Sequence, residues 1–140
     1  MRILALDIGK KRTGIAVSDA DGKIASPVCV LPSNEVFSCA SSFTRVLEDY
    51  EPDLLLAGLP VSMDGGENDH AMWVRIKATE LSDQTGLPLE FQDERLSSAE
   101  AKRIMHEEGM SEREMRGKLD MVAASVFLQT YLDGESGESR

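Results

Sequence analysis

The sequence predicts an α/β fold in which a mixed sheet is covered by helices on both faces. Three short apolar segments follow one another in the first 31 residues, with turn-forming residues between them. Farther along, short apolar segments alternate with longer ones whose apolar residues recur at helical spacing. A hairpin meander followed by βα alternation gives a sheet with both antiparallel and parallel strands. The 140 residues are the size of one domain.

The first part of the chain predicts three antiparallel strands, over residues 3–8, 13–18 and 24–31. Residues 19–22, with the sequence Asp-Ala-Asp-Gly, supply hairpin-turn chemistry, because Asp and Gly tolerate a positive φ. Pro27 cannot donate a hydrogen bond to a neighbouring strand. We therefore expect the third strand at an edge of the sheet.

A helix and a buried strand are predicted next. Ser33 can cap a helix whose apolar residues recur at helical spacing, and Pro52 ends it. Residues 54–57 are a continuous apolar run, which is typical of a parallel strand buried on both faces. A glycine- and acid-rich loop follows over residues 58–69.

The rest of the chain continues the alternation. Ser97 and Glu100 have the spacing of a capping box at the start of a helix that ends at Gly109. The other segments that we expect are a helix over 70–85, a strand over 89–91, a mobile or short helical connection over 110–118, and a last helix over 119–132.

The predicted order is β-β-β-α-β-α-β-α, with five strands in one mixed sheet and the first strand near its centre. This order resembles the RNase H-like fold. The domain is expected to cover residues 1–132. Residues 133–140 have no apolar anchor, and we expect a disordered acidic tail there.

Composition points to a cytoplasmic protein. Asp7 interrupts the first apolar run too early for a signal peptide or a membrane span, so we expect neither. Cys29 and Cys39 lack metal-ligand spacing and are expected to be reduced thiols.

The net charge of −10, from 25 acidic and 15 basic residues, opposes non-specific binding to nucleic acid. The basic residues are nevertheless clustered, so a local basic rim could bind phosphates. The clusters are Lys10, Lys11 and Arg12; Arg95, Lys102 and Arg103; and Arg113, Arg116 and Lys118.

Three carboxylates stand out by their positions. Asp7 lies at the end of the first strand and Glu94 just beyond a later strand, where open α/β sheets place their ligands. Asp120 lies in the first turn of the predicted last helix, whose N-terminus would favour its charged form. Taken singly, each also has an ordinary role, in a turn, a surface ion pair or a helix start. The fold, however, brings all three to one edge of the sheet.

Converging carboxylates repel one another unless a cation or protons compensate them. Their hard oxygen atoms suit Mg²⁺ or Mn²⁺, and such a site can cleave a phosphodiester. We therefore predict Asp7, Glu94 and Asp120 as both the catalytic residues and the metal ligands. Phosphate oxygens would be met by Lys10, Arg12 and Arg95.

Four segments in order resemble the motifs of the YqgF family. They are Leu6-Asp7-Ile8-Gly9-Lys10-Lys11-Arg12-Thr13-Gly14, Gly58-Leu59-Pro60 with Met63-Asp64-Gly65, Gln92-Asp93-Glu94-Arg95-Leu96-Ser97-Ser98, and Lys118-Leu119-Asp120-Met121-Val122-Ala123-Ala124. The match extends from about residue 2 to 132. After the second motif the chain reads Gly66-Glu67-Asn68-Asp69, which departs from the usual family pattern, so it stays open whether residues 61–69 contact substrate.

The resemblance implies an RNase H-like fold and catalytic acids at Asp7, Glu94 and Asp120. It also implies a bacterial, cytoplasmic, metal-dependent endonuclease that processes the 5′ end of pre-16S ribosomal RNA during ribosome biogenesis. Nucleic acid is then the partner, and the ribosome or the transcription machinery is a further one.

Two other functions stay open. A Holliday junction resolvase would act on branched DNA and work as a dimer, and the sequence does not separate a monomer from a homodimer. A catalytically weak binding module associated with the ribosome or with transcription fits the acidic net charge. His70, His106 and Trp73 are interpreted as ordinary surface or packing residues. An actin-like ATPase needs two such domains and is set aside.

Overall fold

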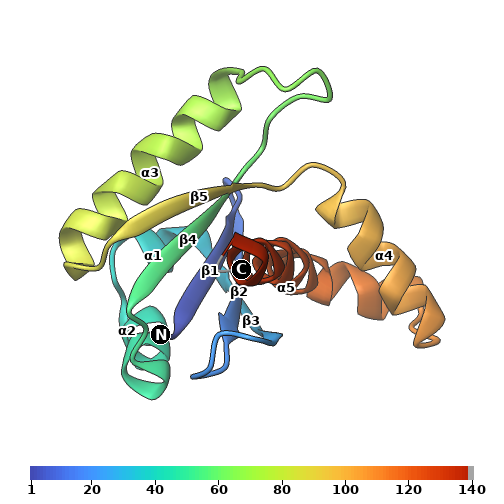
Figure 1. Cartoon of the computed structure of the whole chain (residues 1–140), viewed down its shortest axis with the longest axis horizontal. Coiled ribbons are helices and arrows are strands. Elements are labelled where there is room, and N and C mark those ends of the chain that lie inside the picture. Colours follow the sequence, from blue (N-terminus) through green and yellow to red (C-terminus); the bar gives the residue numbers. More distant parts are fainter. Residues whose placement is uncertain (139–140) are drawn as a thin grey trace.

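Five apolar segments form one sheet in the computed structural model, which describes residues 1–138. The strands are β1 (Ile3–Ile8), β2 (Arg12–Ser18), β3 (Ala25–Pro32), β4 (Leu54–Leu59) and β5 (Leu89–Asp93). They lie in the order β3-β2-β1-β4-β5, in which β1–β2 and β2–β3 are antiparallel and β1–β4 and β4–β5 parallel (Figure 1). The predicted mixed five-stranded sheet is confirmed. The first strand is central, and β3 with Pro27 lies at an edge.

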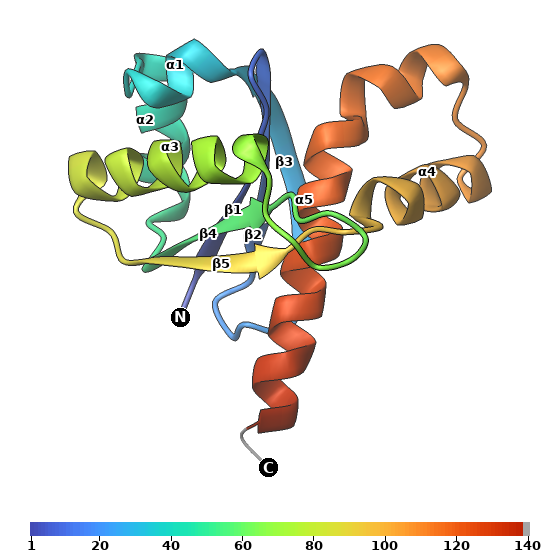
Figure 2. The ribbon, with the colours of Figure 1, turned by 90° about the horizontal axis from the view of Figure 1, so that it is seen from above.

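Helices cover both faces of the sheet, as Figure 2 shows. They are α1 (Ser33–Phe37), α2 (Ser41–Tyr50), α3 (Asp69–Thr85), α4 (Ser97–Glu107) and α5 (Glu112–Glu138). The alternation of β1 sends Leu4 and Leu6 to the core under α1, α2 and α3, and Ile3 and Ala5 to the core under α5. Asp7 continues the second series, so it belongs to the α5 face. The predicted RNase H-like layering is therefore present.

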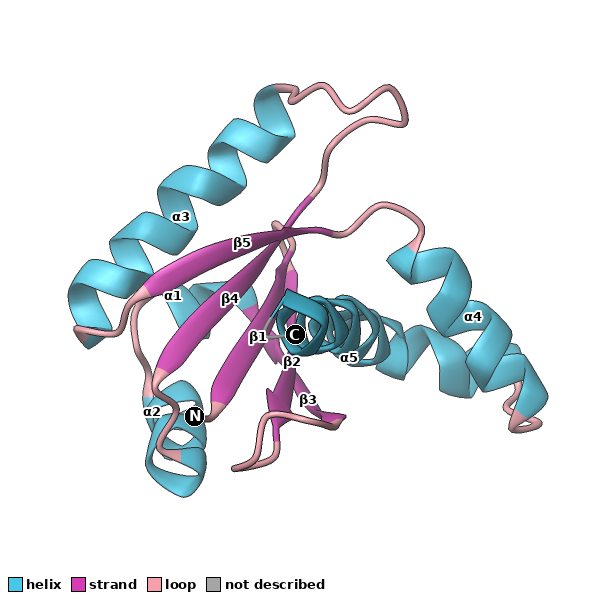
Figure 3. Cartoon of the chain, in the orientation of Figure 1, coloured by secondary structure: helices cyan, strands magenta, loops and turns pink. Residues whose placement is uncertain are grey.

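β4 is the strand that the sequence identified as buried on both faces. All of its residues are buried, with Leu55 and Ala57 under α3 and Leu54 and Leu56 under α5. The loop from β4 to α3 is drawn in pink in Figure 3 and extends beyond the end of the sheet. Asn68 caps α3 by accepting a hydrogen bond from the amide of Ala71 at 3.0 Å.

Two predicted helix features are wrong. The helix expected from Ser33 to Pro52 is divided into α1 and α2, because Cys39 adopts a positive φ of 51° that a helix cannot continue through. The capping box of Ser97 and Glu100 does not form. Ser97 is buried as the first residue of α4, and Leu96 precedes it in the left-handed conformation without a side-chain cap.

The last helix is longer than predicted at both ends. It begins at Glu112, because α4 packs on its first turns through Met105, Met115 and Ala123. Figure 1 shows α4 against this part of α5, away from the sheet. The helix continues to Glu138, over residues where the sequence analysis expected no regular structure. Adding residues to an established helix costs much less than starting one. Residues 139–140 of the predicted tail lie outside the described part.

None of the helices described is both long and apolar enough to cross a membrane.

Candidate functional site

Asp7 lies between two glycines on the neighbouring strands. Gly14 of β2 is its partner across the antiparallel ladder, and Gly58 of β4 follows Ala57, the partner of Leu6. Directly paired residues share a face of a sheet, so both glycines open the α5 face beside Asp7. Space for two further acidic side chains is thereby left around the Asp7 carboxyl group.

Gly14 lets α5 cross the sheet at Asp120. A Cβ at Gly14 would lie 2.1 Å from the carbonyl carbon and oxygen of Asp120, so no larger residue fits under the helix as it stands. Beside this crossing, Ala124 is buried against the sheet, and Ala123 is buried against α4. This close approach carries Asp120 to the end of β1.

Glu94 reaches the same place from β5. Its amide donates to the carbonyl of Leu59 at 3.2 Å, which fixes the backbone just beyond the paired ends of β4 and β5. Its Oε2 lies above Gly58, where an added Cβ would stand 2.8 Å from it. The fold therefore brings together the three carboxylates that the sequence singled out.

The surroundings of the three carboxyl groups disfavour their ionised forms. The pKa of Asp7 is raised well above its ordinary value of 3.8, first by burial and then by the charge of Glu94. A hydrogen bond with Glu94 and the charge of Asp120 raise the pKa of Asp7 further. Burial also raises the pKa of Glu94 and of Asp120. The cluster thus holds more negative charge than its surroundings compensate.

Asp120 does not have the environment that the sequence predicted for it. It lies well inside α5 rather than in its first turn, so the helix N-terminus does not stabilise its charge. Its cationic neighbour is Arg12, whose Nε lies 3.5 Å from Asp120 Oδ2. Burial outweighs that neighbour, because the pKa of Asp120 is raised.

The three predicted phosphate-binding cations lie in different places. Arg12 adjoins the carboxylates, and its side chain is 63% exposed, which leaves donors for a ligand. Lys10 is directed to α3, where its Nζ stands 5.8 Å from the centroid of the Trp73 ring. Arg95 forms a salt bridge with Asp93 at 2.6 Å and donates to the carbonyl of Met63 at 3.1 Å. Arg95 is thus engaged in holding the loop that follows β4.

Replacing Arg95 should loosen that loop. Arg95→Lys cannot make the planar, two-sided contact with Asp93 and the Met63 carbonyl. We expect amide hydrogen exchange in residues 61–66 to become about two- to fivefold faster, since exposed ion pairs contribute ~0.2–1 kcal/mol. Mass-spectrometric exchange would measure this, with Arg103→Lys on α4 as the matched control. An unchanged rate in Arg95→Lys would show that the loop is held by its own turn.

His70 is a site neighbour that sequence reasoning missed. It stacks on Trp73, with 5.7 Å between ring centroids and 15° between planes, and its charge would stabilise the ionised form of Glu94. Trp73 also contacts Phe37 edge-on at 5.8 Å. The sequence holds no local signal for this, because His70 and Glu94 lie on different elements that only the fold brings together.

The carboxylate oxygens of Asp7, Glu94 and Asp120 suit a divalent cation, although the three side chains are not arranged around a common point. Within residues 1–138, no group of three or more His, Cys, Asp or Glu side chains is positioned to hold a metal ion. The reason is visible in their contacts: Asp7 and Glu94 share a hydrogen bond, and Asp120 faces Arg12. Three hard oxygen donors with raised pKa values are nevertheless what a hard cation would neutralise.

Comparison of the sequence with known families identifies this chain. The model of the family described as "RuvX: Holliday junction resolvase" matches residues 1–134. The chain belongs to the RuvX family. This agrees with the resemblance to YqgF proteins in the four motifs.

Curated members of the RuvX family are similar over nearly their whole length. A protein of Anaeromyxobacter sp. (strain Fw109-5), named "Putative pre-16S rRNA nuclease", is 41% identical over 134 residues, which cover 96% of this chain and 98% of the relative. A protein of the same name from Lactococcus lactis subsp. lactis (strain IL1403) is 35% identical over 138 residues and covers 96% of each chain.

Solved structures with the same fold include RuvC of Thermus thermophilus in complex with a Holliday junction substrate. The TM-score is 0.58 at 12% identity, over 98% of this chain and 96% of that one. Fowlpox virus resolvase in complex with Holliday junction DNA gives 0.56 at 16% identity, over 96% of this chain and 99% of that one. At these identities the likeness establishes the fold of the RuvX chain.

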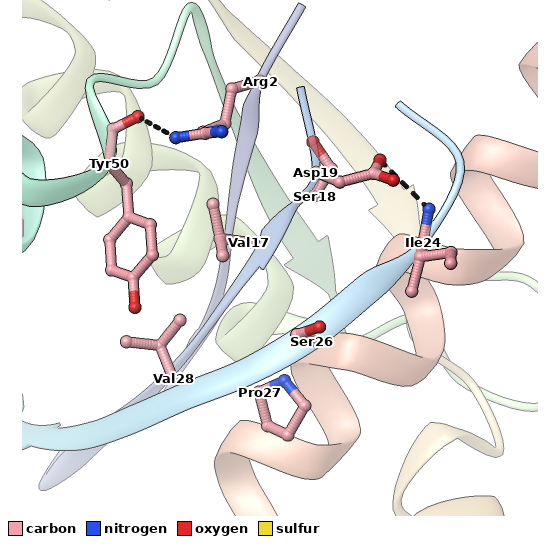
Figure 4. Close-up of a pocket in the computed structure, with 9 residues that line it drawn as sticks. All are labelled: Arg2, Val17, Ser18, Asp19, Ile24, Ser26, Pro27, Val28 and Tyr50. Carbon is pink, nitrogen blue, oxygen red and sulfur yellow. Dashed lines mark hydrogen bonds between the residues drawn. The ribbon is translucent and has the colours of Figure 1, made fainter. Parts of the chain in front are cut away.

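A hollow of about 360 Å³ lies at the end of the sheet opposite to Asp7 (Figure 4). Arg2 donates there to the carbonyl of Tyr50 at 3.1 Å, and Asp19 accepts from the amide of Ile24 at 3.2 Å. Its lining contains none of the predicted site residues. We therefore place the candidate site at the carboxylate end of β1.

Proposed function

We propose that this chain is a divalent-metal-dependent endonuclease of structured nucleic acid that processes the 5′ end of pre-16S rRNA in ribosome biogenesis. The observation that carries the proposal is the convergence of Asp7, Glu94 and Asp120 on one face, made possible by Gly14 and Gly58. Support for the substrate comes from family members named for pre-16S rRNA cleavage.

The carboxylates would hold Mg²⁺ or Mn²⁺, with Asp7 between Glu94 and Asp120. When bound, such a cation polarises a phosphodiester and lowers the pKa of water. Because the pKa of Asp7 is raised, protons would compete with the cation, so occupancy would depend on pH. Arg12, exposed beside Asp120, would bind a non-bridging phosphate oxygen of the substrate.

A second candidate is cleavage of branched DNA. It is favoured by the description of the family and by the fold shared with resolvases in complex with Holliday junction DNA. The same carboxylates would serve both reactions, since both break a phosphodiester. Discrimination by a 2′-hydroxyl requires contacts outside the carboxylate cluster.

A cleavage assay with Mg²⁺ or Mn²⁺ tests the proposal. A precursor ribosomal RNA fragment and a four-way DNA junction would be offered to the wild type, to Asp7→Asn, and to Asp83→Asn as a control with the same charge change on an exposed part of α3. We expect metal-dependent cleavage of the RNA by the wild type and Asp83→Asn, and none by Asp7→Asn. Cleavage of the junction alone would favour the resolvase. Cleavage of neither would favour a catalytically weak binding module.

A further inference from the structure

A cleft of about 390 Å³ opens directly beside the proposed cleavage site. Asp7 and Glu94 line one end. The other lining residues are the apolar Pro60, Val61, Met63, Leu96 and Ala99, together with Arg95 and Ser98. This size is at the lower end of the ~300–1,000 Å³ typical of small-molecule sites. The cleft lies between the loop that follows β4 and the start of α4.

Two large apolar side chains stand unusually exposed at this cleft. Met63 is 70% exposed and Leu96 is 65% exposed, so both present apolar surface to solvent at the cleft. Leu96 also has a φ of 68°, a left-handed conformation that non-glycine residues rarely adopt. The turn closed by the Ser97 amide and the Glu94 carbonyl, 3.0 Å apart, places it there. Such strain tends to gather at functional sites.

The loop that carries Met63 is braced rather than loose. The amide of Ser62 donates to the carbonyl of Gly66 at 2.8 Å, and the amide of Gly65 to the carbonyl of Ser62 at 2.8 Å. Arg95 holds the carbonyl of Met63 from the other side. The Met63 side chain is therefore presented to the cleft by a preformed turn, which lowers the ordering cost of a contact.

From these features we infer that the cleft binds one unpaired nucleobase, that of the nucleotide next to the phosphodiester to be cut. The cation held by Asp7 and Glu94 would take the phosphate to be cut. Arg95, which also lines the cleft, is already paired with Asp93 at 2.6 Å, so the rest of the cleft suits a neutral group. Apolar walls favour a flat ring, since a base turned out of its stack is held between aromatic or apolar side chains. The inference rests on the proposed function, since nucleic acid is the ligand that brings a base to the carboxylates.

A base-binding cleft assigns a substrate class that is defined by base pairing and not by whether the sugar is ribose or deoxyribose. Turning a base out of a duplex costs unstacking and unpairing energy, and the cost is least where the base is already unpaired. The chain therefore selects positions where a paired segment meets an unpaired nucleotide. Such positions occur in folded RNA and in branched DNA.

Binding to 2-aminopurine oligonucleotides tests the inference without requiring cleavage. The Asp7→Asn variant, with Mg²⁺ present, would be titrated with a hairpin whose single 2-aminopurine is either bulged or paired beside the same phosphate. RNA and DNA versions would be used. We expect the bulged probe to bind about tenfold more tightly than the paired one, with a change in 2-aminopurine emission on binding.

Further substitutions in the Asp7→Asn variant test whether the residues that line the cleft bind the base. Met63→Ala and Leu96→Asn should remove most of that preference, and Asn tolerates the left-handed conformation of position 96. Met72→Ala is the matched control, because Met72 is 57% exposed on α3 and does not line the cleft. Equal affinity for the two probes would overturn the inference, as would an equal loss in Met63→Ala and Met72→Ala.

The two proposals fail in different ways. A wild-type protein that cuts neither RNA nor junction, while its Asp7→Asn variant prefers the bulged base, would overturn the nuclease and support the base-binding cleft. A wild-type protein that cuts but shows no such preference would do the reverse.

Discussion

Asp7→Asn should abolish cleavage and at the same time stabilise the metal-free protein at neutral pH. The two effects have one cause, the buried negative charge that Asp7 shares with Glu94 and Asp120. We expect activity to fall by about 1,000-fold or more, because a cation held there contributes several kcal/mol and each ~1.4 kcal/mol is a factor of ten. The free energy of unfolding without metal should rise by roughly 0.5–2 kcal/mol, the usual gain from one stabilising change.

The pH dependence has a definite sign. The pKa of Asp7 in the folded protein lies well above its ordinary value of 3.8, so folding favours the protonated carboxyl group. The stability that this group contributes is fully present below that ordinary value, and it is lost as the pH rises through the raised pKa. The raised pKa values of Glu94 and Asp120 act in the same direction. Metal-free wild type should therefore lose stability from these groups as the pH increases.

Thermal unfolding in EDTA, measured from about pH 4 to pH 8, would show this as a decrease in the wild-type melting temperature relative to Asp7→Asn. Adding Mg²⁺ at neutral pH should raise the melting temperature of the wild type more than that of the variant, because the cation binds only the folded site. Equal Mg²⁺ shifts in the two proteins would contradict a metal site at Asp7.

Local sequence patterns predicted most of the fold because they record burial directly. The apolar runs at residues 3–8 and at Leu54 predict strands that are buried on both faces. The start of α5 could not be read in the same way. Its first turns are mainly polar, and they are helical because Met115 packs under α4, a contact that depends on the tertiary structure. The break at Cys39 likewise has no glycine or proline to mark it.

The candidate site was predicted in part. Asp7 and Glu94 were found because strand ends in such folds converge, and Asp120 because the last helix was expected to reach the same edge of the sheet. The position beside Glu94 also assigned Arg95 to phosphates. The nearby Asp93, which Arg95 binds, was an available signal for an ion pair. Gly14 and Gly58 were also readable, since a glycine inside a strand often marks a close approach of another segment. The apolar cleft was not readable, because Val61 and Ala99 meet only in the folded chain.

Gly14→Ala should be among the most damaging single-methyl changes in this protein. The new Cβ would stand 2.1 Å from the carbonyl group of Asp120 and 2.5 Å from the amide nitrogen of Met121, distances that only a shift of α5 or β2 can relieve. Forcing extra volume into a packed interior costs ~1–3 kcal/mol or more, and here backbone must move. We expect a loss of about 3 kcal/mol and a melting temperature roughly 10 °C lower.

The same shift should also impair cleavage beyond what the loss of stability explains. Moving α5 carries Asp120 away from Asp7, and a misplacement of ~1 Å can reduce a rate about 100-fold. Activity would be measured well below the melting temperature of the variant, so that the folded fraction is not limiting.

Gly117→Ala is the matched control: no atom would lie within 4 Å of its Cβ, and it replaces a glycine inside α5. That change should raise stability by ~0.5–1 kcal/mol and leave cleavage unchanged. The two alanine substitutions should therefore have opposite signs, because one methyl group enters the contact that delivers Asp120 and the other enters solvent. A wild-type melting temperature in Gly14→Ala would show that α5 does not cross β2 at this point.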